Sequence, residues 1–275
     1  MLKKIIFMGT PLFSVSILKS LFQSGYTISA VYTQPPKKSH RGQSFHKSPI
    51  QNIAEELNID FRSPEKLKDD DKEYEFLKKL NADLAIVVAY GQIIPKKFLN
   101  LTKKGFINIH ASILPKWRGA ASIQRSIINL DEETGISIMK INEELDSGPI
   151  SNIYKIKLDQ NLNAMEVSEM LSLLAADKIL ENVNDIFEGK SNFIDQDHSK
   201  ASYAKKITKN EGLIDWNENA LRIIGKINGL YPTPGAFFIF NGERYKILKA
   251  EISSGIGKNG EVITNSLEIA CGDKK

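Results

Sequence analysis

Asn108 and His110 are the polar side chains of an otherwise apolar segment, residues 106–110 (FINIH). Residues two apart in a β-strand point to the same face, so an extended segment would present an amide and an imidazole together, with Ile107 and Ile109 on the other face. An amide can donate hydrogen bonds to a developing oxyanion, and an imidazole can transfer a proton. The pair therefore indicates a catalytic site, although a single histidine in an apolar strand is also often a core residue.

Asp146 is the third residue that this chemistry could use. It lies in a polar turn, residues 142–149 (NEELDSGP), between two expected strands. A parallel sheet would bring the end of the preceding strand to the edge at which His110 lies. Residue types and spacing alone leave two readings open, an Asn-His-Asp site and a structural role for these residues.

Other chemistries have less support in the residue pattern. The remaining histidines, His40, His46 and His198, are too scattered for the several ligands that a metal ion needs. The GxSxG motif of serine hydrolases is absent from the sequence. An amide, a histidine and a carboxylate without an obvious nucleophile suit the transfer of an acyl-type group to an external nucleophile.

The composition is that of an ordinary globular protein. Of its 275 residues, 41% are hydrophobic and 25% are charged, and the formal net charge of +4 weakly favours a polyanionic partner such as nucleic acid. The one cysteine, Cys271, excludes an internal disulfide and a multi-cysteine metal site, so we expect a reducing cytoplasm. No stretch approaches the roughly 20 apolar residues of a membrane span, and we expect no membrane association.

Strands and helices alternate over the first part of the chain. This order predicts a mostly parallel sheet that is covered on both faces, a Rossmann-like α/β architecture without the GxGxxG phosphate signature. The expected strands are residues 5–8, 28–32, 84–89, 106–110, 134–141 and 150–156. The expected helices are one from a Thr10 cap to Gly25, residues 48–57, a short one that starts at Ser63-Pro64, and residues 70–80, 121–130 and 163–188.

The composition changes near residue 189. Residues 189–210 are rich in Asn, Asp, Ser and Lys and have few large apolar side chains, which is typical of a linker. A helix over 215–228 and short strands at 237–240, 245–250, 261–264 and 267–270 indicate a small antiparallel β domain. We therefore expect a catalytic domain in 1–188, a linker in 189–210 and a C-terminal domain in 211–275.

A long polar segment follows the second expected strand. Residues 33–47 (TQPPKKSHRGQSFHK) are basic and longer than most connections in α/β units. A functional loop and a solvated basic loop both fit this composition.

Several segments in order make the chain similar to a known family. FMGTP, VVAYGQIIP, INIHASILPKWRGAASIQRSI, ETGISIM and LDSGPI resemble the methionyl-tRNA formyltransferases, and YAKKI and IDW extend the resemblance over essentially the whole chain. The Asn, the His two positions later, the SLLP-like loop and a distant Asp are shared by folate-dependent formyltransferases in general. WRGAAxIQR is much more specific to the enzymes that act on tRNA.

The resemblance implies an activity and its substrates. A formyl group would pass from 10-formyltetrahydrofolate to the α-amino group of methionyl-initiator tRNA, in the cytoplasm, in a monomeric enzyme that needs no metal. Asn108, His110 and Asp146 would be catalytic. The folate would lie on Ser112, Ile113, Leu114 and Pro115, against Val87, Tyr90, Gly91 and Gln92, and near the turn at 142–147. The tRNA would contact Arg41, Lys37, Lys38 and Lys47 in the basic loop, and Lys205, Lys206 and Lys209 in the linker.

The resemblance also implies a small OB-like β-barrel after the linker, and the sequence departs from the family in two places. Ser122 stands where the family usually has proline, and the sequence stops at Lys275, earlier than is usual, so we expect the barrel to be shortened. Two alternatives remain: a formyltransferase that acts on a nucleotide-linked amino sugar, and a tRNA-binding module without catalysis.

Overall fold

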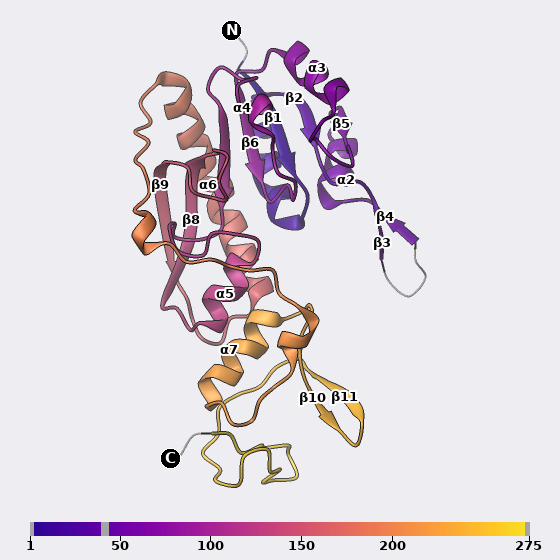
Figure 1. Ribbon diagram of the computed structural model, residues 1–275, viewed down its shortest axis with the longest axis vertical. Helices are drawn as coiled ribbons and strands as arrows, with labels where there is room; N and C mark the ends of the chain where they lie inside the picture. Colours follow the sequence, from indigo (N-terminus) through magenta and orange to yellow (C-terminus); the bar gives the residue numbers. More distant parts are fainter. Residues whose placement is uncertain (1–2, 40–43, 273–275) are drawn as a thin grey trace. The chain divides into compact units, whose positions relative to one another are not determined.

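The computed structural model describes residues 3–39 and 44–272. Within these residues, a seven-stranded sheet has the strand order β5-β2-β1-β6-β7-β8-β9 (Figure 1). Its strands are β1 (Lys4–Gly9), β2 (Thr27–Tyr32), β5 (Phe61–Arg62), β6 (Leu84–Val88), β7 (Phe106–His110), β8 (Glu133–Lys140) and β9 (Ile150–Lys157). Neighbouring strands from β5 to β7 are parallel, whereas β8 is antiparallel to β7. The expected mostly parallel α/β sheet is confirmed.

The helices follow the apolar patterns of the sequence. They are α1 (Val15–Gln23), α2 (Pro49–Glu56), α3 (Asp71–Leu80), α4 (Lys96–Leu99), α5 (Ser122–Ile128), α6 (Ala164–Glu188) and α7 (Ala220–Leu230). Ser48 and Asp70 cap α2 and α3, because their side chains accept hydrogen bonds from the Gln51 and Glu73 amides. Short 3-10 turns occupy Leu12–Ser14, His198–Lys200 and Lys209–Gly212.

Side chains point alternately to the two faces of the sheet, so the core has two layers. Ile6 and Met8 of β1 join a buried cluster that includes Leu77 of α3 and Phe98 of α4. Successive strand residues point to opposite faces, so Ile5 and Phe7, which are fully buried, face the other layer. A strand that is apolar at every position therefore requires cover on both faces, as β1 and β6 have.

The sheet has its topological switch point between β1 and β6. The chain moves from β1 to β2 and β5 on one side and then returns to β6 on the other side of β1. Open α/β sheets bind ligands at such a point, outside the carboxyl ends of the strands. Thr10 joins the two strand ends here, because its hydroxyl donates to the Tyr90 carbonyl at 2.8 Å. The expected capping role of Thr10 is therefore wrong, and Pro11 precedes the first helical turn.

The helix expected to start at Ser63-Pro64 is absent, and bends and turns occupy the described residues 63–70. Hydrogen bonds from a distant side chain replace those of a helix. The Gln92 carboxamide accepts from the Leu67 amide at 3.0 Å and donates to the Pro64 carbonyl at 2.8 Å. Asp69 has a left-handed backbone (φ 61°), which a helix does not tolerate.

The chain divides into two compact units. The first contains described residues of Met1–Lys116, Gly135–Tyr154 and Glu169–Ala201, and the second those of Trp117–Thr134, Lys155–Ser168 and Ser202–Lys275. In the second unit, α7 packs closely on α5. A Cβ at Gly225 would lie 2.7 Å from Leu130 Cδ2 and 3.1 Å from the Ile127 carbonyl oxygen, so a larger residue there would require Leu130 to move.

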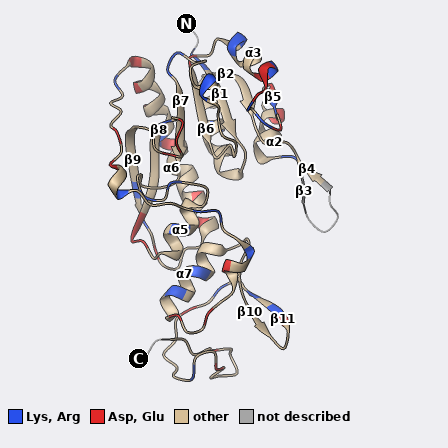
Figure 2. Ribbon diagram, in the orientation of Figure 1, with Lys and Arg blue, Asp and Glu red and all other residues tan. Residues whose placement is uncertain are grey.

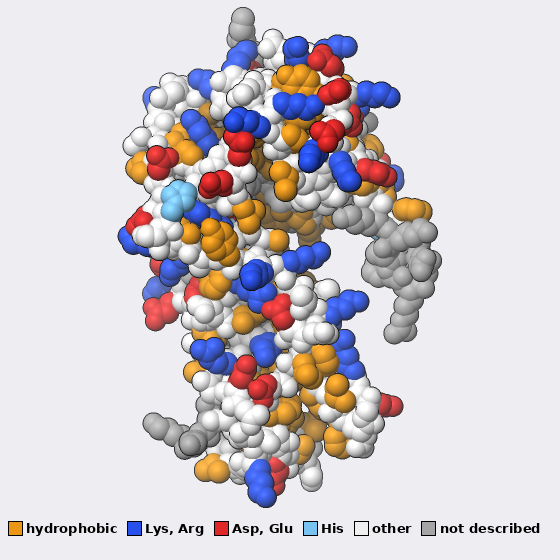
Figure 3. Space-filling model, in the orientation of Figure 1, with side chains coloured by type: hydrophobic (Ala, Val, Ile, Leu, Met, Phe, Trp, Pro, Cys, Tyr) orange, Lys and Arg blue, Asp and Glu red, His pale blue; other side chains and the backbone are white. Residues whose placement is uncertain are grey.

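The C-terminal part of the second unit contains a two-stranded antiparallel sheet, β10 (Ala236–Phe240) with β11 (Glu243–Ile247). This confirms the antiparallel arrangement, but the strands expected at 261–264 and 267–270 pair only through one bridge, Val262 with Ile269. Exposed Val262 and Leu267 give that pair little packing, and an isolated hairpin is marginal in water. Figure 3 shows apolar side chains at the surface over the β10–β11 region.

The helix expected to start at residue 215 starts later, at Ala220, and is α7. Residues 215–219 form a turn in which the Asp215 carboxylate accepts from the Asn217 amide at 3.0 Å. Asn219 then caps the helix by accepting from the Arg222 amide at 2.8 Å. Asp and Asn favour such local bonds over helix interiors, which delays the start of α7.

Candidate active site

Strand β7 has the bounds that the sequence predicts, and it presents Asn108 and His110 on one face. His110 is 7% exposed and Asn108 is partly buried. Val87 of β6 is in register with Asn108, and Ser137 of β8 is in register with His110. The amide and the imidazole therefore lie between a parallel and an antiparallel neighbour.

Asp146 lies beside both side chains. Asn108 Nδ2 is 3.4 Å from Asp146 Oδ1, and His110 Nδ1 is 3.7 Å from Asp146 Oδ2. The second distance allows an ionic attraction but is too long for a hydrogen bond. The Asp146 side chain is 18% exposed, so the three groups form a largely desolvated polar cluster.

The expected reason for this proximity is wrong. Because β8 runs antiparallel to β7, it ends beside the beginning of β7, where the Ile141 amide donates to the Phe106 carbonyl at 2.8 Å. The turn at 142–149 therefore starts at the edge opposite His110. Asp146 reaches His110 by folding back over the face of β7 rather than from a shared carboxyl edge.

Three features characterise the conformation of this turn. Asp146 has a left-handed backbone (φ 46°), which is uncommon for a residue other than glycine. Gln196 Nε2 donates to the Asp146 carbonyl at 2.9 Å and to the Gly148 carbonyl at 2.8 Å. A Cβ at Gly148 would lie 1.9 Å from the Lys140 carbonyl oxygen, so no larger residue fits there without movement.

The loop at 112–115 is held by a neighbouring strand. Ser137 on β8 donates its hydroxyl to the Ser112 carbonyl at 2.7 Å and accepts from the Leu114 amide at 3.1 Å. The Ser112 hydroxyl donates to the Lys116 carbonyl at 2.6 Å, and the Leu114–Pro115 peptide is cis. Ile113 is partly buried and lies in the same turn. The loop is thus a fixed surface next to the end of β7.

The segment that follows β6 is also fixed. Tyr90 is 1% exposed, and burial raises the pKa of its hydroxyl, with a smaller contribution from Glu73. Gly91 has a left-handed backbone (φ 83°). Both polar atoms of the Gln92 side chain bond to the backbone of residues 64 and 67. Backbone rather than the Gln92 carboxamide is therefore what this segment offers to a ligand.

The basic loop contains a short antiparallel pair, β3 (Lys37–Ser39) with β4 (Ser44–His46), so Lys37 and Lys38 are strand residues. Arg41 lies outside the described residues. Lys47 Nζ donates to both carboxylate oxygens of Glu55, at 3.0 and 2.8 Å, and remains half exposed. Figure 2 shows lysines and arginines on elements of both units.

In the second unit, Lys205, Lys206 and Lys209 are all exposed, as a phosphate-binding role requires. Arg125 on α5 sets the path of this segment. Its Nε and Nη2 donate to the Lys205 carbonyl at 3.1 and 3.0 Å, and its Nη1 donates to Glu211 Oε2 at 2.6 Å. The hydrogen bond from Arg125 lowers the pKa of Glu211 to about 2.

The WRG segment is tied to the chain around residue 203, also within the second unit. The Arg118 amide donates to the Ser202 carbonyl at 2.8 Å, and the Ala204 amide donates to the Arg118 carbonyl at 2.7 Å. Trp117 has a left-handed backbone (φ 60°), and its indole donates to Asp131 at 2.7 Å. The motif thus holds the start of the lysine-rich segment in place.

Sequence reasoning missed Gln196, Ser137 and Arg125 as residues that shape the site and its surroundings. Gln196 lies in a polar segment that has the composition of a linker, and Ser137 is one small residue in an alternating strand. Their importance depends on contacts with distant residues, and no local pattern signals such contacts. Arg125 belonged to the quoted motif, but its partner Glu211 lies in another segment.

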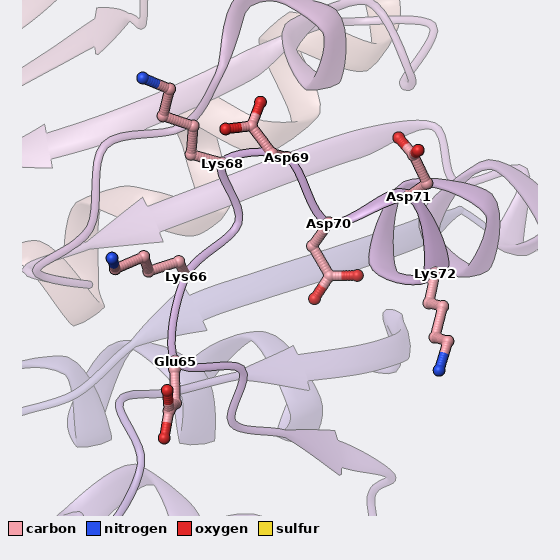
Figure 4. Close-up of a pocket in the computed structure, with 7 residues that line it drawn as sticks. All are labelled: Glu65, Lys66, Lys68, Asp69, Asp70, Asp71 and Lys72. Carbon is pink, nitrogen blue, oxygen red and sulfur yellow. The ribbon is translucent and has the colours of Figure 1, made fainter.

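A separate surface hollow lies at the start of α3 and contains charges of both signs (Figure 4). Its lining residues are Glu65, Lys66, Lys68, Asp69, Asp70, Asp71 and Lys72. Mixed charges on an open surface give no preference for an anion or a cation. Neither here nor elsewhere in the described residues is a group of three His, Cys, Asp or Glu side chains placed to hold a metal ion. None of the described helices is both long and apolar enough to span a membrane.

Comparisons with known proteins agree with this geometry. A family model described as formyl transferase matches residues 3–182, and one described as formyl transferase, C-terminal domain, matches residues 206–275. The chain is 66% identical over 275 residues to the methionyl-tRNA formyltransferase of Pelagibacter ubique (strain HTCC1062), covering 100% of this chain and 89% of that protein. It is 41% identical over 274 residues to the methionyl-tRNA formyltransferase of Chelativorans sp. (strain BNC1), covering 98% and 88%.

A solved structure shares the fold at lower identity. It is an N-formyltransferase from Helicobacter canadensis in complex with folinic acid and dTDP-3-aminofucose, 20% identical, with a TM-score of 0.71 over 96% of this chain and 90% of that chain. At this identity the likeness concerns the fold alone. The two relatives with higher identity decide the assignment, and the chain belongs to the methionyl-tRNA formyltransferase family.

Proposed function

We propose that this chain transfers the formyl group of 10-formyltetrahydrofolate to the α-amino group of methionyl-initiator tRNA. Asn108, His110 and Asp146 are the catalytic residues of this proposal. The observation that carries it is the placement of the Asp146 carboxylate 3.4 Å from the Asn108 amide and 3.7 Å from the His110 imidazole, in a chain of this family. The product would be N-formylmethionyl-tRNA for translation initiation.

The amine needs little activation. A free α-amino group titrates near pH 8, so a useful neutral fraction exists at pH 7 without a strong base. The amine nitrogen bonds to the formyl carbon, the bond from that carbon to folate N10 breaks, and the proton lost by the amine balances the one gained at N10. The costly feature of this path is negative charge on the formyl oxygen.

The cluster is suited to stabilise that charge. The Asn108 amide carries two hydrogens, and Asp146 can accept only one of them, so the other can be donated to the oxygen. A protonated His110 would add a charge-assisted hydrogen bond, and the Asp146 carboxylate 3.7 Å away stabilises positive charge on the ring. One donor to an oxyanion contributes about 3–4 kcal/mol to lowering a barrier.

The folate would lie between two fixed backbone segments. One is the loop of Ser112, Ile113, Leu114 and Pro115, which Ser137 holds. The other follows β6 and includes Val87, Tyr90, Gly91 and Gln92; Val87 supports this placement because it is in register with Asn108. Fixed backbone donors and acceptors are typical of sites that orient a small molecule.

The tRNA would contact basic residues in two segments. We assign phosphate contacts to Lys37, Lys38, Arg41 and Lys47 in the basic loop and to Lys205, Lys206 and Lys209 in the segment before α7. Phosphate contacts fix the position of a nucleic acid rather than read its sequence. The division into residues 1–188, 189–210 and 211–275, a cytoplasmic location and a monomeric state belong to the same proposal.

The experiment uses formyl-labelled 10-formyltetrahydrofolate with charged initiator tRNA and, in competition, a nucleotide-linked amino sugar. We expect label on the tRNA at a rate that the sugar does not change. The Asn108→Ala variant should fold normally and lose most of the single-turnover rate. Label on the sugar alone would overturn the assigned substrate. An unchanged rate for Asn108→Ala would overturn the catalytic role of Asn108. The Arg41→Ala variant tests the basic loop at residues 33–47. If this variant keeps the tRNA binding and the kcat/KM of the parent, the loop does not contribute to the tRNA interface.

A further inference from the structure

Gln196 is a buried side chain that supports the turn of Asp146. It is 6% exposed, and its Nε2 donates to the carbonyls of both Asp146 and Gly148, at 2.9 and 2.8 Å. The two hydrogens of one amide group therefore bond to two carbonyls of a single turn. Gln196 lies between the segments that the two formyl transferase models match, 3–182 and 206–275.

The position of Gln196 is itself fixed by the sheet. Ile194 and Ile150 exchange two backbone hydrogen bonds of 2.8 and 2.9 Å, which attaches the segment of Gln196 to the start of β9. The turn that precedes β9 contains Asp146. The Gln196 side chain thus connects the start of β9, which is fixed in the sheet, to the turn that contains Asp146.

The turn needs such support because its conformation is unfavourable by itself. A left-handed backbone is strained for a residue other than glycine and persists only where its surroundings determine it. Asp146 has this conformation, and its side chain reaches back over β7 from the opposite edge of the sheet. Its carboxylate lies at 3.4 Å from Asn108 and at 3.7 Å from His110 only while the turn keeps this shape.

We propose that Gln196 is a positioning residue for formyl transfer, which holds the Asp146 carboxylate against His110 and Asn108 through the Asp146 and Gly148 carbonyls. This inference rests on the proposed function. Gln196 contacts backbone rather than reacting atoms, so its effect passes through Asp146. Because the carboxylate acts on charge that develops during the reaction, its displacement lowers kcat more than it raises KM.

The main variant is Gln196→Met, which keeps the length of the side chain and removes both donors. We expect kcat to fall about 10- to 100-fold, because a displacement near 1 Å in a catalytic group can cost about 100-fold. KM for the folate and for the tRNA should stay within about threefold of the parent value. A fall in kcat/KM caused by KM alone would overturn the proposal.

A double-mutant cycle separates positioning from general loss of structure. If Gln196 acts through Asp146, then Gln196→Met should slow Asp146→Asn by less than about twofold, because the carboxylate is already absent. Independent, multiplicative effects of the two substitutions would contradict the proposal. Gln196→Asn, which keeps the amide group but shortens the side chain, should lose less rate than Gln196→Met and serves if the latter does not fold.

Gln51→Met is the matched control. Gln51 is also buried, at 7% exposure, and its Nε2 donates to Glu55 at 3.0 Å within the same unit. We expect this variant to lose thermal stability and keep kcat, and an equal loss of kcat in both variants would refute a specific role for Gln196. Failure of the proposed function would show differently, as absence of tRNA formylation by the parent chain. The same series would then be measured with the amine that the parent does formylate.

Discussion

Substitution of Gly148 by alanine tests whether the turn of Asp146 sets the reaction rate. The new Cβ would lie 1.9 Å from the Lys140 carbonyl oxygen and 3.0 Å from the carbonyl carbon. These are backbone atoms of β8, which cannot rotate away as a side chain can. The turn must therefore move by about 1 Å before the contact becomes tolerable.

Such a movement reaches the cluster of Asn108, His110 and Asp146, because Asp146 is two residues away and shares the Gln196 donor with Gly148. A displacement of about 1 Å costs about 100-fold in rate, which corresponds to roughly 2.7 kcal/mol of barrier. We expect a loss of this size in the single-turnover rate of formyl transfer from 10-formyltetrahydrofolate at saturating substrates.

The control for this prediction is Gly25→Ala, at the end of α1. Gly25 has a left-handed backbone (φ 82°), and a Cβ there would meet nothing within 4 Å. This substitution should lower the melting temperature by backbone strain while the rate stays within about twofold. If Gly148→Ala folds and retains the parent rate within about threefold, the reasoning that links this turn to catalysis is refuted.

Three further predictions concern other parts of the molecule. His110→Ala should lower kcat by more than about 100-fold with a melting temperature near that of the parent, measured by formyl transfer and thermal unfolding; a small change in kcat would make His110 a core residue. The double substitution Lys205→Ala and Lys206→Ala should reduce the slope of log KM for tRNA against log salt by roughly 2, since each phosphate contact contributes about 1; an unchanged slope would remove both lysines from the interface. Arg125 holds the pKa of Glu211 at about 2, below its usual 4.5, so the ionised pair stabilises the fold above pH 4.5 and this contribution is lost as the pH falls toward 2. Glu211→Gln should therefore lower the urea midpoint most near pH 7, and a deficit that grows on acidification would contradict this sign.

The sequence predicted those parts of the site whose residues are close together in the chain. The apolar runs at β6 and β7 could be read directly, because strands buried on both faces need apolar residues at every position. The spacing of Asn108 and His110 then fixed their common face. The start of the helix at 48–57 was equally local, since Ser48-Pro49 supplies a capping side chain and a proline at the first helical position.

Strand direction was not available from the pattern. Residues 134–141 alternate in the same way whether the strand runs parallel or antiparallel to β7, so the sequence could not place the end of β8. A second limit is that local patterns do not reveal hydrogen bonds to distant residues. The Gln196 and Gln92 carboxamides both bond to the backbone of turns that lie far away in the sequence. The helix expected at Ser63 is absent for this reason, because the Gln92 carboxamide donates to the Pro64 carbonyl and accepts from the Leu67 amide.

Because β8 is antiparallel to β7, the length of the turn at 142–149 determines where Asp146 lies along β7. Its chain must return along β7 by a set distance, and each residue of extended chain spans about 3.3 Å. One inserted or deleted residue would therefore move the carboxylate by nearly the whole 3.7 Å that separates Asp146 from His110. Surface loops usually tolerate changes in length. In this enzyme, we expect natural variation to change the residues of this turn other than Asp146 and Gly148, but to keep their number.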